Sequence, residues 1–333
     1  MEKLRLGRTD LEITPIGLGC MQFSGPSGLA RQVFAPLGPA GVTEVIRAAL
    51  DAGITWFDTA EMYGRGHSET ALTNALRACG VAPGDVTIAT KWAPMARTAR
   101  NIPRTIDDRL AALQGYPIDL YQIHEPFSSI GPVAPQLRAM AALQAAGKIR
   151  SVGVSNFNAK RMAAAHQTLR AAGVVLASNQ VQINLLHRAI EHNGVLAEAR
   201  RLGVTLIAYS PLAGGVLTGR FHEQSATRQT VAPLRRLGHS GAFSARGLAR
   251  SAPLIAELRA IGASHGGASV AQTALNWLVT YYGDAVVAIP GASKHGQATE
   301  AGTAMDFQLT TAEVARIDEL SRQATGPARA RAV

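Results

Sequence analysis

The chain contains 333 residues, of which 47% are hydrophobic and only 5% are aromatic. A chain of this length buries a large core, either as one α/β barrel or as two smaller domains. The formal net charge is +10, but no run of five or more basic residues occurs and the charge is spread along the chain. We therefore expect a solvated, arginine-rich surface and no nucleic-acid partner.

The cysteine content and the search for targeting segments indicate the cellular compartment. Cys20 and Cys79 are too few for a disulfide framework in a chain of this size. The first ten residues contain no apolar segment of signal-peptide length, and no stretch approaches 18 uninterrupted apolar residues. We therefore expect a cytoplasmic protein with no membrane partner. The nine histidines include no His-x-x-x-His pair and no cysteine at ligand spacing, so no metal site is expected.

The first element expected along the chain is a β-hairpin, formed by residues 3–6 and 11–13. After it, short apolar runs alternate with segments whose apolar residues keep one helical face. The runs expected to form strands are residues 16–21, 54–58, 86–91, 118–124, 149–155, 174–180, 204–210 and 285–290. The expected helices are residues 42–52, 68–78, 103–114, 133–146, 158–172, 194–201, the extra pair 251–265 and 269–282, and the final helix 311–323. Thr310 and Glu313 stand at capping-box spacing at the start of this last helix.

Eight strands that alternate with helices predict a parallel sheet closed into a (β/α)8 TIM barrel, with the N-terminal β-hairpin and extra helices added to it. We expect one catalytic domain over residues 1–324 and a flexible tail at residues 325–333. An open, doubly wound sheet is the alternative. Residues 17–22 argue against it, because Gly-Leu-Gly-Cys-Met-Gln lacks the third glycine of a dinucleotide-binding fingerprint. Three segments too long for simple turns follow strand ends and should overhang the same mouth: residues 22–40, 125–132 and 214–250.

Three consecutive strand runs end in the ionisable side chains of Asp58, Lys91 and His124, and Tyr63 follows the first run in a glycine-rich loop. The carboxyl ends of its strands are where a barrel enzyme keeps its chemistry. A phenol with an ordinary pKa of about 10 is a poor acid at neutral pH, and a neighbouring ammonium lowers that pKa. We therefore expect Lys91 to activate Tyr63 as a proton donor. Asp58 then holds Lys91 in place, and His124 orients a carbonyl oxygen.

Amide and hydroxyl groups end the next strand runs. Ser155, Asn156 and Gln180 offer donors and acceptors for a carboxamide, and Tyr209 offers a flat ring for stacking. Such a set suits a proton donor that lies beside a bound ring carrying a carboxamide.

Five motifs around these residues occur in order. They are Gly-Ile-Thr-Trp-Phe-Asp-Thr-Ala-Glu-Met-Tyr-Gly at 53–64, Ile-Ala-Thr-Lys at 88–91, Asp-Leu-Tyr-Gln-Ile-His at 119–124, Gly-Val-Ser-Asn-Phe at 153–157 and Ala-Tyr-Ser-Pro-Leu at 208–212. With them, the chain resembles the aldo-keto reductases along nearly its whole length. Within this family, the chain is similar to the pyridoxal reductases over its middle third, and the potassium-channel β subunits, which share the barrel and its cofactor site, are the other candidate branch.

The resemblance implies a (β/α)8 barrel that binds NADP(H) without a Rossmann motif and reduces a small-molecule carbonyl substrate. It implies a catalytic tetrad of Asp58, Tyr63, Lys91 and His124, in which the tyrosine protonates the carbonyl oxygen as hydride reaches the carbon. The cofactor contacts expected around the nicotinamide and the phosphates are Ser155, Asn156, Gln180, Tyr209, Ser210, Pro211, Leu212, Gly214 and Gly291.

The adenosine end of the cofactor in this family lies after the last strand. There Ser293 and Lys294 offer a hydroxyl and a cation for a 2′-phosphate. Gln297 and Glu300 fall where the family contacts the adenine ribose and ring, whereas Ala301 replaces the family's usual asparagine and puts one adenine hydrogen bond in question. The candidates for an apolar substrate pocket are Met21, Phe23, Trp92 and Phe127.

The leading hypothesis is an NADPH-dependent reductase of aldehydes or ketones, with pyridoxal among the candidate substrates. One alternative is a sugar or alcohol dehydrogenase that runs the reaction in reverse. Another is a cofactor-binding regulatory subunit with little turnover. A lyase or aldolase that uses Lys91 as a Schiff-base amine is a further class, but it leaves Ser155, Asn156, Gln180 and Tyr209 without a role. The pattern specifies neither the physiological substrate nor an oligomeric state.

Overall fold

The structure is a computed structural model that describes residues 2–26, 37–223 and 241–325, together with Ala232, Arg236 and His239. The expected tail beyond Thr325 and the central parts of the expected long segments 22–40 and 214–250 lie outside the described residues.

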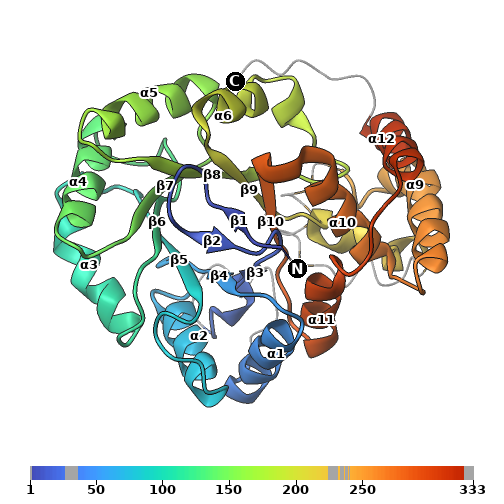
Figure 1. The fold of residues 1–333 in the computed structure, drawn as a ribbon, viewed down its shortest axis with the longest axis horizontal. Helices are drawn as coiled ribbons and strands as arrows, with labels where there is room; N and C mark the ends of the chain where they lie inside the picture. The colour runs from blue at the N-terminus through green and yellow to red at the C-terminus, as the bar shows by residue number, and fades with distance from the viewer. Residues whose placement is uncertain are drawn as a thin grey trace.

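Eight parallel strands form a closed barrel (Figure 1). In sheet order they are β3 (Leu18–Gly19), β4 (Trp56–Asp58), β5 (Thr87–Trp92), β6 (Leu120–Ile123), β7 (Ser151–Ser155), β8 (Leu176–Gln182), β9 (Thr205–Tyr209) and β10 (Val286–Ile289). Parallel bridges from Ile16 to Ala288 and from Gly19 to Gly291 join the first strand to the last. Each strand coincides with one of the eight predicted runs, so the barrel prediction is confirmed.

Helices surround the barrel on the outside (Figure 1). Six helices each precede one of the strands β4 to β9 in the chain. They are α1 (Pro39–Asp51), α2 (His67–Ala78), α3 (Asn101–Ala112), α4 (Val133–Ala145), α5 (Ala159–Arg170) and α6 (Val195–Leu202). The later helices are α7 (Arg220–Glu223), α9 (Ala245–Ser264), α10 (Val270–Tyr282), α11 (His295–Thr303) and α12 (Thr311–Thr325). Short 3-10 turns lie at η1 (Met21–Phe23), η3 (Ala189–Glu191), η4 (Ala213–Thr218) and η6 (Gly283–Ala285). Among the described helices, none is both long and apolar enough to cross a membrane.

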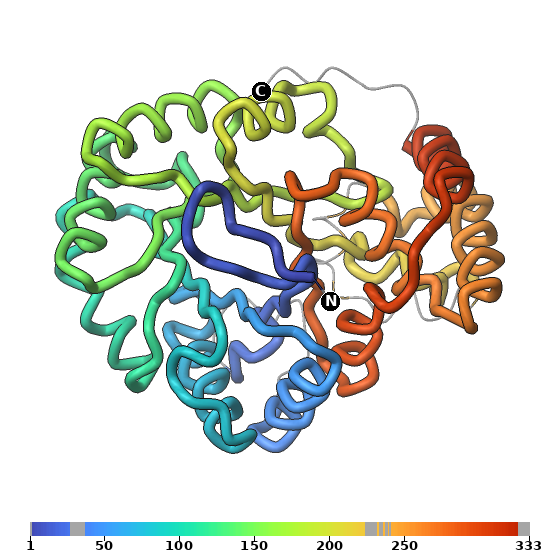
Figure 2. Tube along the Cα trace, viewed as in Figure 1, coloured from blue at the N-terminus to red at the C-terminus, as the bar shows by residue number. Residues whose placement is uncertain are grey.

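Three helices differ clearly from the prediction, and one of them, α7, lies in the expected long segment 214–250. α9 begins six residues before the predicted position 251, because the Ser244 hydroxyl caps it by accepting the Gly247 N–H at 2.9 Å. Figure 2 shows α9 and α12 side by side on one flank of the barrel. α11 was not predicted, because it contains two glycines and only small buried residues, so no apolar stripe marks it. The predicted capping box of α12 is present, with the Thr310 N–H donating to Glu313 at 2.8 Å and the Glu313 N–H donating to the Thr310 hydroxyl at 3.2 Å.

The predicted hairpin closes one end of the barrel. Its strands β1 (Leu4–Arg5) and β2 (Glu12–Ile13) pair antiparallel and lie across the barrel axis (Figure 2). Leu6, Leu11 and Ile13 are buried there against barrel residues Trp56, Ala89, Leu120, Ala177, Ile207 and Val287. At Gly7 the backbone has a φ of +60°, and a Cβ would lie 2.4 Å from the Ala177 carbonyl oxygen, so the turn requires glycine.

The barrel interior is layered, because alternate residues of a strand point to the same face. The apolar layer that contacts the hairpin contains Trp56, Ala89 and Leu120. Two residues further along the same strands lie Asp58, Lys91 and Gln122, which are buried polar side chains. The apolar layer therefore separates the hairpin from a polar layer at the carboxyl ends of the strands.

We predict that Leu11→Ala lowers the free energy of unfolding by about 2–5 kcal/mol, because it removes a buried side chain and leaves a cavity. Leu11 is 2% exposed. The matched control is Val175→Ala, since Val175 is 40% exposed, and it should change stability by less than about 0.5 kcal/mol. Equilibrium unfolding in urea measures both. Equal losses in the two variants would show that the hairpin does not contribute to the core.

Candidate active site

A buried ion pair lies at the centre of the polar layer. Lys91 of β5 is 0% exposed, and its Nζ pairs with Oδ1 of Asp58, which ends β4 and is 2% exposed. Nζ also donates to the Thr59 carbonyl oxygen at 2.9 Å. Burial alone would lower the pKa of Lys91, but Asp58 and Tyr63 outweigh it and raise that pKa above its ordinary value. Lys91 is therefore an ammonium group across the neutral range.

Asp58 also orients two amide side chains. Its Oδ2 accepts from Gln180 Nε2 at 2.9 Å and from Gln122 Nε2 at 3.1 Å. Because a carboxylate only accepts, both glutamines must present their amino groups to it. The Gln180 carbonyl oxygen is thus directed away from Asp58, where it can accept a hydrogen bond from an N–H donor.

Gln122 is a residue that the sequence reasoning missed. It lies in β6, two positions before His124, which directly follows the strand, so the two-residue period places both on the inner face. Gly153 of the neighbouring β7 leaves room for it, since a Cβ there would lie 3.0 Å from Gln122 Cγ. The two-residue period of the strand is the sequence signal that marks Gln122, since a position at the end of a run does not include it.

The structure brings Tyr63 and His124 to the ion pair. Lys91 Nζ lies 5.2 Å from the Tyr63 ring centroid, and the Tyr63 and His124 rings meet edge to face with centroids 5.9 Å apart. Burial raises the pKa of Tyr63, and Lys91 lowers it by less. The expectation that Lys91 brings this pKa below its ordinary value is therefore corrected, because desolvation of the phenolate outweighs the ammonium. Tyr63 is a protonated phenol at neutral pH.

His124 is neutral at neutral pH. Burial and the charge of Lys91 lower the pKa of His124 to about 3. Its Nδ1 atom is buried and has no hydrogen-bond partner among the described residues. A neutral imidazole next to the phenol offers one N–H donor without competing with Lys91 for negative charge.

The expected carboxamide-binding residues are contiguous with this cluster. The Ser155 hydroxyl donates to the Gln180 backbone carbonyl oxygen at 2.9 Å, and Asn156 Nδ2 donates to the Ser155 hydroxyl at 3.1 Å. The Tyr209 hydroxyl donates to Asn156 Oδ1 at 3.1 Å, which holds its ring beside Asn156. Asn156 has a φ of +62°, a strained conformation of the kind found at functional sites.

The remaining expected cofactor contacts lie after β9 and β10. Pro211 is buried, Leu212 and Gly214 are half-buried, and Ser210 has a φ of +50° with its carbonyl oxygen accepting from Asn184 at 3.0 Å. Gly291 is exposed, and a Cβ on it would lie 2.1 Å from the Gln22 amide, so the side chain of Gln22 packs against it.

The expected phosphate site lies at the start of α11. Lys294 is its N-cap residue and is exposed, and the Ser293 N–H donates to Gln297 Oε1 at 2.8 Å. Glu300 is half-buried on the same helix, and Ala301 is 2% exposed. A helix N-terminus with a hydroxyl and an exposed cation suits an anion such as a phosphate.

The four substrate candidates separate into two groups. Phe23 and Trp92 are both 0% exposed and belong to the main core, with Trp92 Nε1 donating to Asn101 at 2.9 Å. Because these two rings are buried, a contact between them and a substrate stays a prediction. Met21 is half-buried and Phe127 is 71% exposed, so these two retain surface for a ligand. Among the described residues, no group of three or more His, Cys, Asp or Glu is arranged to hold a metal ion.

Comparison with known proteins agrees with the barrel fold. The chain matches the Aldo/keto reductase family over residues 15–322. It is 36% identical to an uncharacterized oxidoreductase of Mycobacterium tuberculosis over 90% of this chain and 86% of that protein. It is 27% identical to the chloroplastic pyridoxal reductase of Arabidopsis thaliana over 97% of this chain and 86% of the relative. A solved glycerol dehydrogenase from Gluconobacter oxydans superposes with a TM-score of 0.80 at 26% identity, covering 99% of this chain and 98% of that one.

These findings define the chain as a (β/α)8 oxidoreductase. It belongs to the aldo/keto reductase family.

We predict that Asp58→Asn lowers the free energy of unfolding by about 3–5 kcal/mol, because it leaves the buried Lys91 ammonium without a charged partner. The amino group of the new asparagine also faces one of the N–H donors of Lys91, Gln122 or Gln180 that the Asp58 carboxylate binds. The matched control is Asp107→Asn, which removes an exposed ion pair with Lys148 of 2.6 Å and should cost at most about 1 kcal/mol. Chemical denaturation measures both. A loss at Asp58 no larger than at Asp107 would contradict the account of the polar layer.

Proposed function

We propose that the protein is an NADPH-dependent reductase of aldehydes or ketones, in which Tyr63 donates the proton. It acts as one catalytic domain over residues 1–324, in a reducing cytoplasmic compartment that suits the free cysteines Cys20 and Cys79. The observation that carries the proposal is the protonated Tyr63 phenol held 5.2 Å, ring centroid to Nζ, from the buried Lys91 ammonium.

Four side chains of the protein have separate roles in this reaction. The Tyr63 hydroxyl donates its proton to the carbonyl oxygen of the substrate, and the resulting phenolate is stabilised by Lys91. The neutral His124 donates an N–H to the same oxygen and orients it. Asp58 keeps Lys91 charged and in place. Water then returns a proton to Tyr63.

NADPH, when bound, supplies the hydride for this reduction. The residues present fit its carboxamide end, because Asp58 leaves the Gln180 carbonyl oxygen free to accept an amide N–H. Ser155 and Asn156 lie beside it, and the ring of Tyr209 is held next to them for stacking on the nicotinamide. The contacts to the phosphates of NADPH would come from Ser210, Pro211, Leu212, Gly214 and Gly291.

The residues at α11 fit the other end of NADPH. Lys294 and Ser293 would hold the 2′-phosphate at the helix N-terminus, and Gln297 and Glu300 would contact the adenosine. Ala301 is buried and offers no hydrogen bond, so Glu300 and Gln297 would recognise the adenosine without the asparagine usual at that position.

The substrate we propose is a small neutral carbonyl compound that contacts Met21 and Phe127. The pyridoxal reductase and glycerol dehydrogenase among its relatives suggest a panel of pyridoxal, glyceraldehyde and simple ketones, and oxidation of the matching alcohols tests the reverse reaction. A Schiff-base role for Lys91 is disfavoured, because an amine that attacks a carbonyl must lose its proton, whereas the pKa of Lys91 is raised.

We predict that Tyr63→Phe lowers the carbonyl reduction rate by at least about 10²–10⁴-fold, the usual contribution of a general acid, while NADPH affinity stays near wild type. Steady-state reduction and fluorescence titration of NADPH measure the two effects. Lys91→Met should also lose turnover without losing affinity. A Tyr63→Phe variant that reduces aldehydes at the wild-type rate would exclude Tyr63 as the donor. A wild-type protein that binds NADPH but reduces nothing in the panel would favour the regulatory subunit.

We predict that Lys294→Ala weakens NADPH binding about ten-fold or more, because one charge-assisted contact is worth about 1.5–3 kcal/mol. NADH, which lacks the 2′-phosphate, should bind with unchanged affinity. The matched control is Lys160→Ala on α5, which removes an equal charge from a surface helix that carries no expected cofactor contact. Fluorescence titration with both cofactors measures this. Equal losses for NADPH and NADH would mean that Lys294 does not recognise the phosphate.

A further inference from the structure

Two buried carboxylates flank Tyr63 and take no part in the chemistry proposed above. Glu61 lies two residues before Tyr63 and is 7% exposed, and Glu69 lies six residues after it and is 0% exposed. Burying a carboxylate costs free energy unless it is paired and hydrogen-bonded. The hydrogen-bond and ion-pair partners of these two side chains therefore indicate their structural role.

Each carboxylate accepts a hydrogen bond from a residue near Lys91, Glu69 from within β5 and Glu61 from just after it. Glu69 Oε1 accepts from the Thr90 hydroxyl at 2.6 Å, directly before Lys91 in the chain. Glu61 Oε1 accepts from the Ala93 N–H at 2.5 Å, two residues after Lys91. The Glu61 N–H also donates to the Lys91 carbonyl oxygen at 3.3 Å. The loop that carries the phenol and the start of α2, which follows it, are thus attached to both sides of the residue that carries the ammonium.

Arg109 of α3 joins the two carboxylates from outside. Its Nη1 lies 2.6 Å from Glu69 Oε2, and its Nε lies 4.0 Å from Glu61 Oε2. Arg109 is 9% exposed, so this pairing is little weakened by water. Arg97 adds a second cation at 2.6 Å from Glu61, but it is 37% exposed.

The loop itself is tightly folded over this arginine. The Gly66 N–H donates to the Glu61 carbonyl oxygen at 3.1 Å, and the Ser68 N–H donates to the Tyr63 carbonyl oxygen at 3.1 Å. Gly66 has a φ of +94°, and a Cβ there would lie 3.5 Å from both Arg109 amino groups. The guanidinium of Arg109 therefore lies close to the loop backbone that carries Tyr63.

We propose that Arg109, Glu61 and Glu69 form a clamp that positions Tyr63 beside Lys91. This inference rests on the proposed function, because it concerns the donor and the ammonium of that reaction. Arg109 is a positioning residue, since it acts through the two carboxylates and not on substrate. Burial raises the pKa of Glu69 and Arg109 opposes that shift, so loss of Arg109 would leave the buried Glu69 carboxylate without its cation and weaken its hold on Thr90.

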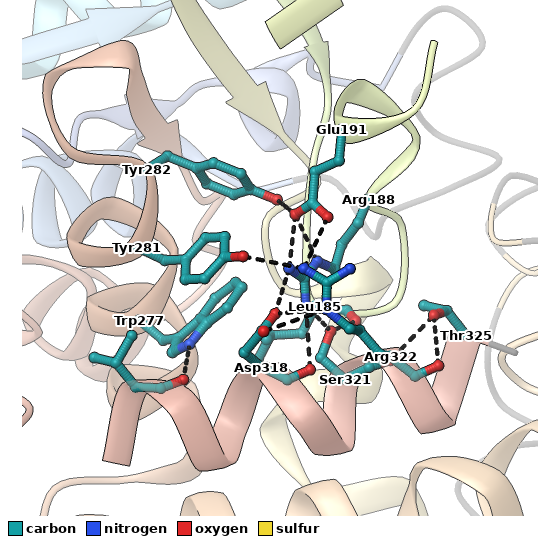
Figure 3. A network of polar contacts seen from close by, with 11 residues as sticks. Leu185, Arg188, Glu191, Trp277, Tyr281, Tyr282, Asp318, Ser321, Arg322 and Thr325 are labelled. Carbon is teal, nitrogen blue, oxygen red and sulfur yellow. Dashed lines mark hydrogen bonds and ion pairs between the residues drawn. The ribbon is translucent and has the colours of Figure 1, made fainter. Parts of the chain in front are cut away.

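A second buried arginine supplies the matched control. Arg188 is 6% exposed and binds Glu191 at 2.7 Å and Asp318 at 2.5 Å on the outer flank of the barrel (Figure 3). Its guanidinium also lies 5.0 Å from the rings of Trp277 and Tyr281. These partners belong to η3, α10 and α12, so Arg188 matches Arg109 in burial and pairing but not in its connection to Tyr63.

The experiment compares Arg109→Met, Arg109→Lys and Arg188→Met in single-turnover carbonyl reduction from about pH 6 to pH 11, with NADPH affinity measured on each. We expect Arg109→Met to reduce the substrate at least about ten-fold more slowly at saturating NADPH, because misplacing a reacting group by 1 Å can cost about 10²-fold. NADPH affinity should stay within about two-fold of wild type. Arg109→Lys should recover part of the rate, and Arg188→Met should keep the wild-type rate.

The pH profile separates positioning from general loss of structure. Reduction needs protonated Tyr63, so the rate falls as pH rises through its pKa, and Lys91 lowers that pKa. A Tyr63 displaced from Lys91 should therefore lose activity at a higher pH than wild type. This alkaline limb should shift upward in Arg109→Met and stay in place in Arg188→Met. A wild-type rate and an unshifted limb in Arg109→Met would overturn the clamp.

Two further variants test the clamp if Arg109→Met does not fold and separate the clamp from the proposed function. Thr90→Val removes only the hydroxyl that Glu69 accepts, and it should slow reduction and shift the limb in the same direction if Arg109→Met fails to fold. An unshifted limb in Thr90→Val would then overturn the clamp. Tyr63→Phe separates the two proposals. If it is inactive while Arg109→Met behaves as wild type, only the clamp fails, whereas an active Tyr63→Phe refutes the proposed function itself.

Discussion

The buried ion pair between Lys91 and Asp58 is the interaction on which the rest of the site depends. Taking two charges out of water costs several kcal/mol per ion, so such a pair is weak evidence for stability. Here the cost is offset by a full set of hydrogen bonds: Lys91 donates to Thr59, and Asp58 accepts from Gln122 and Gln180. The pair keeps an ammonium charged inside a barrel, and that charge acts on the neighbouring phenol of Tyr63.

The barrel explains why these groups meet. The N-terminal hairpin and the apolar layer around Trp56 close one end, so the polar layer two residues further along the strands is the first that a ligand can reach from the mouth. Asp58 then links two functions. One oxygen binds Lys91, which lies beside Tyr63, and the other accepts from Gln180 and leaves the carbonyl oxygen of that amide directed elsewhere. The clamp around Arg109 adds a connection from outside the barrel to the same strand.

Much of this arrangement could be predicted from the sequence. Each strand is a short apolar run bounded by polar residues, so the eight strands and the inward positions of Asp58, Lys91 and His124 followed from spacing alone. Gln122 was missed although the two-residue period marks it. α11 was missed because close packing, with Gly302 against Ala52, replaces an apolar stripe. The direction of the pKa shift of Tyr63 depends on its burial, and whether Phe23 and Trp92 face a pocket depends on packing, neither of which local sequence specifies.

The charge of Lys91 can be measured directly. The chain has five lysines, so the Nζ signals of ¹⁵N-lysine-labelled protein can be resolved by NMR, and Lys91→Met assigns the one of interest. The account predicts that Lys91 keeps its ammonium signal to a pH above about 10.4, where ordinary lysines lose theirs. A Lys91 that deprotonates near neutral pH would contradict it, because an uncharged amine cannot stabilise the phenolate of Tyr63 and would instead suit Schiff-base chemistry.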